Sequence, residues 1–176
     1  MTIEDPIYLI HRHWMSQAIA LAQSAGEAGE VPVGAAIVDA NNTLIAAAEN
    51  RRERDKDPTA HAEILALRAA GQALQTWHLN DCTLYVTLEP CPMCAGAIVL
   101  ARIGLLVYGA DDPKTGTIRT VANIPDSACS NHRLPVIAGV MESICRQQLQ
   151  TWFEHRRYRL NSASHNLTHD TDRSVP

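Results

Sequence analysis

The sequence predicts a single α/β domain of three layers, in which helices cover both faces of a mixed sheet of about five strands. Short apolar runs with strand composition alternate with longer runs that space apolar residues as a helix does. Two strand candidates are joined by a turn signal, which indicates antiparallel pairing, and later ones are separated by a helix, which indicates parallel pairing. At 176 residues the chain can bury one substantial core.

The first elements are a helix and a hairpin. Apolar residues recur at helical spacing from His11 to about Glu27, and glycine and proline follow that stretch. Residues 34–39 and 43–48 are short apolar runs on either side of Asn41-Asn42, which is typical of a turn. We therefore expect a β-hairpin after the first helix.

The central elements alternate between helix and strand. A helix is expected at 60–74, because Asp57-Pro58 supplies an N-cap residue and a proline suited to the first helical position. Residues 83–88 are rich in β-branched and aromatic side chains and predict a strand. A helix at 92–101 and a strand at 103–108 complete a unit that implies parallel strands.

The last part of the chain is less regular. Residues 110–135 are interrupted by Asp, Gly, Pro and Asn, so we expect an irregular loop, and long loops in compact domains are often functional. A strand at 135–140 and a helix at 141–160 follow. Residues 161–176 are polar and predict a disordered tail outside the domain of residues 1–160.

The composition of the chain bears on the cellular location of the protein. No uninterrupted apolar stretch approaches the length of a membrane span, and Glu4 and Asp5 precede any apolar run, unlike a secretory signal. Cys82, Cys129 and Cys145 belong to no ligand motif and are expected to be reduced thiols. These features fit a cytoplasmic protein that does not enter a membrane.

Charge leaves nucleic-acid binding open. The net charge of −4 argues against such a partner if only the total is considered. Residues 50–56 and residues 141–160 nevertheless each carry four basic side chains against two acidic ones. Clusters of this kind are more often solvated surface than RNA contacts, so charge alone does not decide between the two interpretations.

Two short motifs supply the ligands of a metal site. They are His61-Ala62-Glu63 and Pro90-Cys91-Pro92-Met93-Cys94, and each lies at the start of an expected helix. Zinc binds cysteine sulfur and histidine nitrogen, and a catalytic zinc keeps one position open for water. His61, Cys91 and Cys94 therefore predict one Zn²⁺ per chain between two helix N-termini, whose positive ends favour thiolate.

Glu63 is not needed as a ligand in such a site. Zinc with two thiolates and a neutral imidazole is formally neutral, and water bound to it titrates near pH ~7. Glu63 is then free to act as the catalytic base and to pass a proton to a substrate nitrogen. The alternative is a closed structural site with Glu63 as fourth ligand, although structural sites are typically richer in cysteine.

These motifs resemble the signature of the zinc-dependent nucleoside and nucleobase deaminases. Further segments between about residues 11 and 160 are similar to bacterial tRNA adenosine deaminases, namely Glu30-Val31-Pro32-Val33-Gly34-Ala35, Asn50-Arg51, residues 57–64, residues 83–91, Cys94-Ala95-Gly96-Ala97, Tyr108-Gly109-Ala110, Asp112, Lys114-Thr115-Gly116 and Asn131-His132-Arg133. The resemblance implies a cytidine-deaminase-like fold and a homodimer.

The resemblance also implies an activity. Similar enzymes convert adenosine to inosine at the wobble position of a tRNA anticodon, and the resemblance points to an arginine tRNA. A deaminase of free guanine, cytosine or cytidine would use the same zinc chemistry and is the main alternative. A noncatalytic zinc-stabilised scaffold is a second alternative, but it would have no use for Glu63.

Substrate contacts follow from the same resemblance. Asn50, which composition alone reads as a turn residue, would hydrogen-bond the target nucleotide, and the base pocket would be lined by Val33, Leu88 and Pro90. The anticodon stem-loop would be contacted by Asp112, Lys114, His132, Arg133, Arg156 and Arg157. A small substrate has no need for this second set. Trp152-Phe153 could stack on bases, but adjacent aromatics on a terminal helix are more typically one core and one rim residue.

Overall fold

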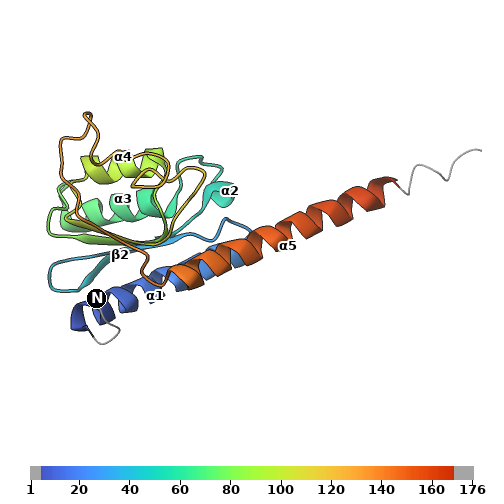
Figure 1. Ribbon diagram of the computed structural model, residues 1–176, viewed down its shortest axis with the longest axis horizontal. Coiled ribbons are helices and arrows are strands. Elements are labelled where there is room, and N and C mark those ends of the chain that lie inside the picture. The colour runs from blue at the N-terminus through green and yellow to red at the C-terminus, as the bar shows by residue number, and fades with distance from the viewer. Residues whose placement is uncertain (1–4, 169–176) are drawn as a thin grey trace, which may run out of the picture.

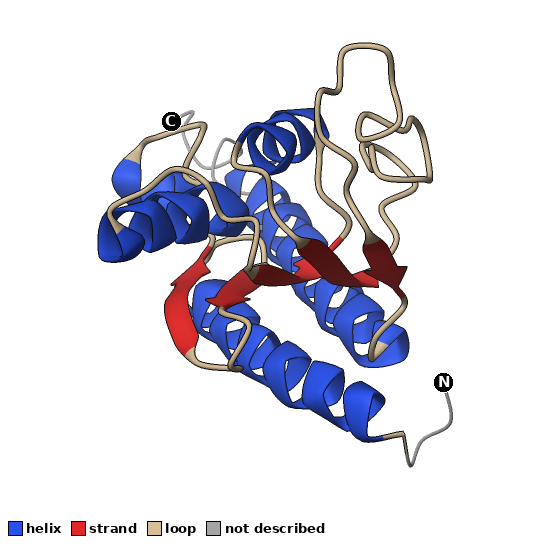
Figure 2. Cartoon of the chain, turned by 90° about the vertical axis from the view of Figure 1, so that its left-hand side faces the viewer, coloured by secondary structure: helices blue, strands red, loops and turns tan. Residues whose placement is uncertain are grey.

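A five-stranded sheet between two layers of helices organises the molecule (Figures 1 and 2). The computed structural model describes residues 5–168, with side chains placed for residues 5–159. Helices α1 (Pro6–Glu27) and α5 (Glu142–Thr168) cover one face, and α3 (Ala62–Leu74) and α4 (Pro92–Leu100) cover the other. The predicted three-layer α/β class is confirmed.

The sheet has the strand order β2-β1-β3-β4-β5. The antiparallel part contains β2 (Leu44–Glu49), β1 (Gly34–Val38) and β3 (Thr83–Leu88). The parallel part continues from β3 through β4 (Leu105–Ala110) to β5 (Val136–Ala138). Because Leu88 pairs with Ala110, β3 and β4 end at the same edge of the sheet, as expected for strands joined by a helical crossover.

Alternate side chains of the central strands fill two separate cores. Leu84 and Val86 belong to the cluster on one face, and Tyr85 between them belongs to the cluster on the other. This alternation is the period of two that a strand imposes on its side chains. Burying a large apolar side chain contributes about 1.5–3 kcal/mol, so both helical layers are held to the sheet by the hydrophobic effect.

Helix α1 begins earlier than predicted, at Pro6 and not at His11. The side chain of Asp5 accepts a hydrogen bond from the Ile7 backbone N–H at 2.9 Å, and Pro6 occupies the first helical turn. The sequence therefore contains a standard start signal, an N-cap residue followed by proline, that the apolar pattern alone overlooks.

The same dipeptide does not start α3, which begins at Ala62 and not at the predicted Ala60. The Asp57 carboxylate accepts the backbone N–H and the hydroxyl of Thr59, both at 2.7 Å, and forms a local turn. The Arg51 N–H donates to the Ala60 carbonyl at 3.0 Å. Tertiary pairing therefore keeps Ala60 out of the helix and leaves His61 as the N-cap residue.

Two smaller differences concern helices and the tail. A four-residue helix, α2 (Arg52–Asp55), lies in a segment where none was predicted. The last helix continues to Thr168, so the expectation of disorder is wrong for 161–168, and residues 169–176 lie outside the described residues. Extending an existing helix costs no new nucleation, which lets polar residues continue it.

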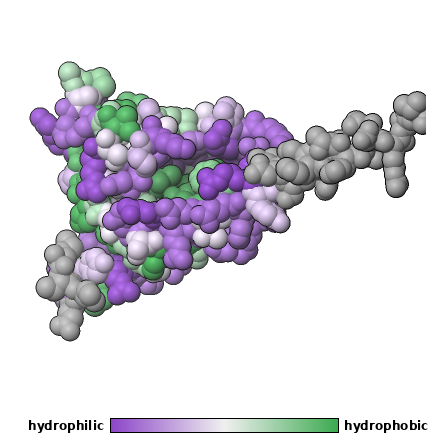
Figure 3. Space-filling view, turned by 45° about the vertical axis from the view of Figure 1, so that its right-hand side comes forward, coloured by the Kyte–Doolittle hydropathy of each residue, from purple (hydrophilic) through white to green (hydrophobic). Residues whose placement is uncertain are grey.

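The long loop is confirmed, since no helix or strand lies between Ala110 and Val136. It lies on the side of the sheet that carries α3 and α4 (Figures 1 and 2). Among the described helices, none combines the length and the apolar character that crossing a membrane requires. The face of the molecule in Figure 3 is largely hydrophilic, with apolar residues showing mainly in its recesses.

Candidate active site

His61, Cys91 and Cys94 converge at the starts of α3 and α4. The His61 Nδ1 lies 3.7 Å from the Cys91 Sγ and 3.5 Å from the Cys94 Sγ, and the three ligand atoms lie within 4.8 Å of one another. A tetrahedral zinc with ordinary Zn–N and Zn–S bonds would separate N and S by about 3.6 Å. The three side chains therefore have the spacing of a zinc site.

Local structure explains this convergence. His61 is the N-cap residue of α3, and Cys91 is the N-cap residue of α4, with Pro92 at the first helical position. Cys94 follows three residues later, so it lies on the same face of the first turn. Strand β3 ends just before Cys91, which brings the second motif to the sheet edge where β3 and β4 both end.

The electrostatics of this cluster favour a thiolate at Cys91. Hydrogen bonds from Cys94 and from His61 lower the pKa of Cys91 to about 4. The same bond to Cys91, together with burial, raises the pKa of the Cys94 thiol, so the pair shares one proton. A metal ion binds the deprotonated thiols and displaces such protons, as expected for cysteine ligands.

Glu63 is buried beside His61, Cys91 and Cys94 but does not belong to the cluster that these three residues form. Its side chain is 4% exposed, and burial raises the pKa of its carboxyl group. Among the described residues, the cluster close enough to share a metal ion contains His61, Cys91 and Cys94 and does not include Glu63. The geometry therefore favours a carboxyl group that exchanges protons over the fourth ligand of a closed site.

Asn50 has an unsatisfied acceptor. Its backbone N–H donates to the Val33 carbonyl at 2.9 Å, and its Nδ2 donates to the Val31 carbonyl at 3.2 Å. Its Oδ1 is buried without a hydrogen-bond partner. Buried polar atoms are nearly always paired, so this oxygen is a feature that a bound ligand would explain.

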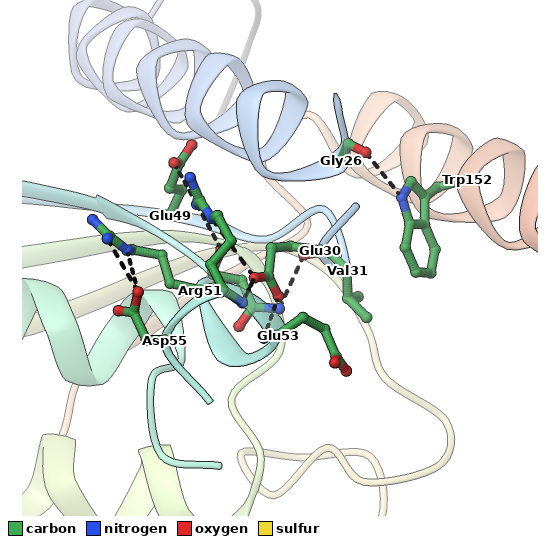
Figure 4. Close-up of polar contacts among 10 residues, drawn as sticks. Gly26, Glu30, Val31, Glu49, Arg51, Glu53, Asp55 and Trp152 are labelled. Atoms are coloured by element: carbon green, nitrogen blue, oxygen red, sulfur yellow. Dashed lines mark hydrogen bonds and ion pairs between the residues drawn. The ribbon is translucent and has the colours of Figure 1, made fainter. Parts of the chain in front are cut away.

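The buried carboxylate of Glu30 holds the turn that follows β2 (Figure 4). Glu30 is fully buried and accepts the backbone N–H groups of Glu53 at 3.0 Å and Arg54 at 2.8 Å, at the start of α2. The Arg54 guanidinium in turn donates to the Asn50 carbonyl at 3.3 Å. Glu30 therefore satisfies helix N–H groups that would otherwise lack partners and fixes the turn after β2.

The three residues predicted to line the base pocket are all at least half-buried. Val33 and Pro90 are buried and Leu88 is half-buried. Val33 is bonded to Asn50 through the backbone, and Pro90 directly precedes the ligand Cys91. Their role as pocket walls stays a prediction.

The loop after β4 lies against the candidate metal centre, that is, the cluster of His61, Cys91 and Cys94. The backbone N–H of Thr117 donates to the Pro90 carbonyl at 3.0 Å. The Asp112 carboxylate accepts bonds from the backbone N–H groups of Lys114 and Thr115 and from the Thr115 hydroxyl. Asp112 therefore shapes this loop, which exposes two basic side chains, Lys114 and Arg119, and Arg119 is paired with Asp111 at 2.9 Å.

His132 and Arg133 lie elsewhere. The His132 Nε2 is 2.7 Å from the carbonyl of Ile103, which precedes β4, whereas the metal centre lies where β3 and β4 end. This contact ties the loop to the body of the protein. Arg133 is exposed and pairs with Asp126 at 3.3 Å. Within one chain, the structure does not bring these two residues to the metal centre.

Helix α5 projects beyond the body at the end where α2 lies (Figure 1). Trp152 is half-buried and donates to the Gly26 carbonyl at 3.2 Å, whereas Phe153 is exposed, which confirms one packed and one rim aromatic. Arg156 and Arg157 are exposed, and the Arg156 guanidinium lies over the Trp152 ring at 5.2 Å. The aromatic face of Trp152 is thus occupied by an arginine of its own helix.

Two residues with structural importance at the site were not singled out from the sequence, namely Glu30 and Glu89. Each is an acidic residue beside an apolar or proline-containing segment, and each is almost completely buried. A carboxylate next to a strand is compatible with an exposed turn, so only the tertiary structure reveals how many backbone N–H groups each one binds.

Comparison with known proteins gives a consistent family. The model of the MafB19-like deaminases matches residues 10–149. The chain is 46% identical over 155 residues to the tRNA-specific adenosine deaminase of Bacillus subtilis, covering 88% of this chain and 96% of that protein.

Solved structures agree. One from a study of A-to-I editing by tRNA:A34 deaminases at the wobble position has a TM-score of 0.76 and 44% identity, covering 78% of this chain and 99% of that one. Guanine deaminase from Nitrosomonas europaea is more distant, with a TM-score of 0.68 and 26% identity, covering 80% of this chain and 83% of that one.

Proposed function

The chain belongs to the family of tRNA-specific adenosine deaminases, and from this premise we propose that it converts adenosine to inosine at the wobble position of a tRNA anticodon. The observation that carries the proposal is the convergence of His61, Cys91 and Cys94, with buried Glu63 beside them. The reaction is hydrolytic: water replaces the amino group at C6 of adenine, and ammonia leaves.

The three ligands fit zinc in donor type, in spacing and in burial. Zinc held by His61, Cys91 and Cys94 would lower the pKa of water and make it a nucleophile near neutral pH. The chain contributes the Cys91 thiolate, the Cys94 thiol and two helix N-termini, which favour negative charge at this position. No further side chain is required to complete the ligand set, because a catalytic site keeps one position for water.

Glu63 has the proton-transfer role in this proposal. Its carboxylate takes a proton from the attacking water, then delivers protons to the adenine ring and to the departing amino group. Burial raises the pKa of Glu63, which favours capture of a proton by its carboxylate.

Asn50 is proposed to orient the target nucleotide. Its unpaired Oδ1 would accept a hydrogen bond, while its Nδ2 remains bonded to Val31. Val33, Leu88 and Pro90 would pack against the base after it leaves the stack of the anticodon loop. A base that fills this pocket would satisfy the buried oxygen.

The RNA itself is proposed to bind through basic residues around the pocket. Lys114 and the pair Arg156 and Arg157 are exposed, and α5 projects past the end of the molecule at which α2 lies (Figure 1). Asp112 would contribute by shaping the Lys114 loop, and His132 by anchoring the segment that carries Arg133, which would contact phosphates distant from the target base. An arginine tRNA is the proposed substrate on the resemblance of the motifs.

A homodimer in the cytoplasm is also proposed. Helix α4 contains no charged, hydroxyl or amide side chain, and its Leu100 is 66% exposed. A helix that is apolar on all sides is usually buried, so a second copy of the chain is a suitable cover for it. A Leu100→Lys variant should then sediment as a monomer; a dimer that persists would place the interface elsewhere.

The cysteines support the proposed location in the cytoplasm. The described cysteines are free, which suits a reducing compartment.

The decisive experiment offers the purified protein an arginine tRNA with adenosine at the wobble position and detects inosine by sequencing. The same preparation is given free guanine, cytosine and cytidine, with ammonia release as the readout. Inosine at the wobble position alone supports the proposal. Deamination of a free base without action on tRNA would overturn it in favour of a small-substrate deaminase.

A further inference from the structure

The second buried carboxylate, Glu89, lies between β3 and the metal ligand Cys91. Its side chain is only 2% exposed, yet no basic side chain forms an ion pair with it among the described residues. A buried charge without a countercharge is costly unless hydrogen bonds replace its lost water. The donors around Glu89 therefore indicate what it does.

All of these donors come from the loop that follows β4. The Oε1 atom accepts the backbone N–H groups of Ile118 at 3.1 Å, Arg119 at 2.8 Å and Thr120 at 3.0 Å. The Oε2 atom accepts the backbone N–H of Asp112 at 3.1 Å and the hydroxyl of Thr120. One carboxylate thus binds both ends of the segment 112–120.

The middle of the same loop is fitted to this carboxylate. A Cβ atom added at Gly116 would overlap the Glu89 carboxylate. Because Gly116 does not have a positive φ, the close approach of this carboxylate, and not the backbone conformation, explains why the residue is glycine. The neighbouring Thr117 bonds the Pro90 carbonyl through both its backbone N–H and its hydroxyl. The loop is therefore folded onto the two residues that immediately precede Cys91.

Lys114 lies at the exposed tip of this loop. The Asp112 carboxylate accepts the Lys114 backbone N–H at 2.9 Å, and the Asp112 N–H is itself held by Glu89. The chain of contacts from Glu89 through Asp112 to Lys114 connects a buried anion to an exposed cation. A cation held in this way would bind RNA without a large loss of loop entropy.

We propose that Glu89 is a positioning residue for tRNA binding, which folds the loop 112–120 beside the metal centre and thereby presents Lys114 to the RNA backbone. This inference rests on the proposed function, because it needs tRNA as the substrate. It assigns Glu89 neither a ligand nor a proton-transfer role.

The test uses a substitution for which electrostatics and loop positioning predict opposite changes in tRNA binding. Glu89→Gln removes a negative charge near the RNA, so electrostatics alone would tighten tRNA binding. If Glu89 positions the loop, the variant should instead bind tRNA more weakly. The glutamine amide would direct its own N–H group at the N–H donors of the loop and so release the loop. We expect KM for tRNA to rise about tenfold while kcat and zinc content stay within about twofold of the parent.

A second variant tests the same contact from the loop side. Gly116→Ala introduces the overlapping methyl group without changing charge and should also raise KM. Gly71→Ala on α3 is the matched control, because the atom that a Cβ there would meet within 4 Å is the Thr76 carbonyl oxygen at 3.3 Å, which lies outside the loop. If Glu89→Gln does not fold, Gly116→Ala measured against Gly71→Ala decides the inference.

A double-mutant cycle with Lys114→Gln separates positioning from general stability. If Glu89 acts through the loop, Lys114→Gln should weaken tRNA binding less in the Glu89→Gln background than in the parent. Additive effects would overturn the inference, as would an unchanged KM or a loss of zinc with Glu89→Gln. A parent protein that forms no inosine in tRNA would instead contradict the proposed function, which keeps the two failures distinguishable.

Discussion

The metal centre and the projecting part of α5 are constructed in opposite ways. At the metal centre Cys94 and Glu63 are buried, and helix starts and hydrogen bonds fix the reactive groups. Along α5 beyond Trp152, every side chain through Arg159 is exposed. The first region depends on tight burial, and the second on charge presented to solvent.

This difference separates the residues expected to affect the reaction from those expected to affect tRNA binding. A buried group that loses its partner costs the full desolvation penalty, whereas an exposed charge contributes little to folding and acts mainly through long-range attraction. Substitutions in the metal centre should therefore change metal content, reaction rate and stability. Substitutions on α5 should change tRNA binding and its dependence on salt.

Cys91→Ala should have the largest effect. It removes a ligand and should abolish zinc binding and deamination, and it should lower the melting temperature, because metal binding is coupled to folding. Cys129→Ala is the control, since that cysteine is exposed and far along the chain from the ligands. Zinc per chain, inosine formation and thermal melting are measured together. A Cys91→Ala protein with full zinc would remove this residue from the ligand set.

Glu63→Ala should separate the chemistry from the metal. Deamination should fall by about 10²–10⁴-fold, the usual contribution of general acid–base catalysis, with zinc content unchanged. Glu63→Gln keeps the size of the side chain and should behave in the same way. Loss of zinc in both variants would identify Glu63 as a ligand and favour the closed structural site.

Asn50→Ala should have an intermediate effect, because it removes a substrate contact and leaves the metal. Losing one hydrogen bond in a buried pocket costs about 1–3 kcal/mol, so kcat/KM for tRNA should fall by roughly 5–150-fold. Asn41→Ala, in the exposed turn of the hairpin, is the matched control. Deamination equal to that of the parent would leave Asn50 with a structural role in its turn.

Replacing both Arg156 and Arg157 by Gln should change affinity and not chemistry. The plot of log affinity against log salt should flatten by roughly one to two phosphate contacts, and single-turnover deamination at saturating tRNA should stay the same. Arg146→Gln is the control on the same helix, because that arginine pairs with Glu142. An unchanged salt slope would assign the pair to solvated surface and weaken the tRNA proposal.

Truncation after Leu160 should have the smallest effect. The contacts of α5 with the body are made by earlier residues such as Cys145, Gln148 and Trp152, and these remain. Melting temperature and activity should match those of the full chain in parallel assays. A large loss of either would show that the segment after Leu160 contributes to the fold or to tRNA binding.

Two Asp-Pro pairs show that a local helix-start signal does not by itself decide where a helix begins. Asp5-Pro6 and Asp57-Pro58 have the same local chemistry, but only the first starts a helix. The second pair is held in a turn, and the Ala60 carbonyl is bonded by Arg51 from another part of the chain. Local propensity is a weak preference that tertiary hydrogen bonds can override.

The sequence by itself determined the layers of the fold and the group of residues that could hold a metal ion. Apolar periodicity identifies the sheet and its helices, and the two spaced motifs identify His61, Glu63, Cys91 and Cys94, because ligand type and helix-start geometry are local properties. The tertiary structure alone decided the roles of Glu30 and Glu89, the unpaired oxygen of Asn50 and the separation of His132 from the metal centre. Each of these depends on backbone groups distant in sequence, and a buried carboxylate is defined by the donors that surround it.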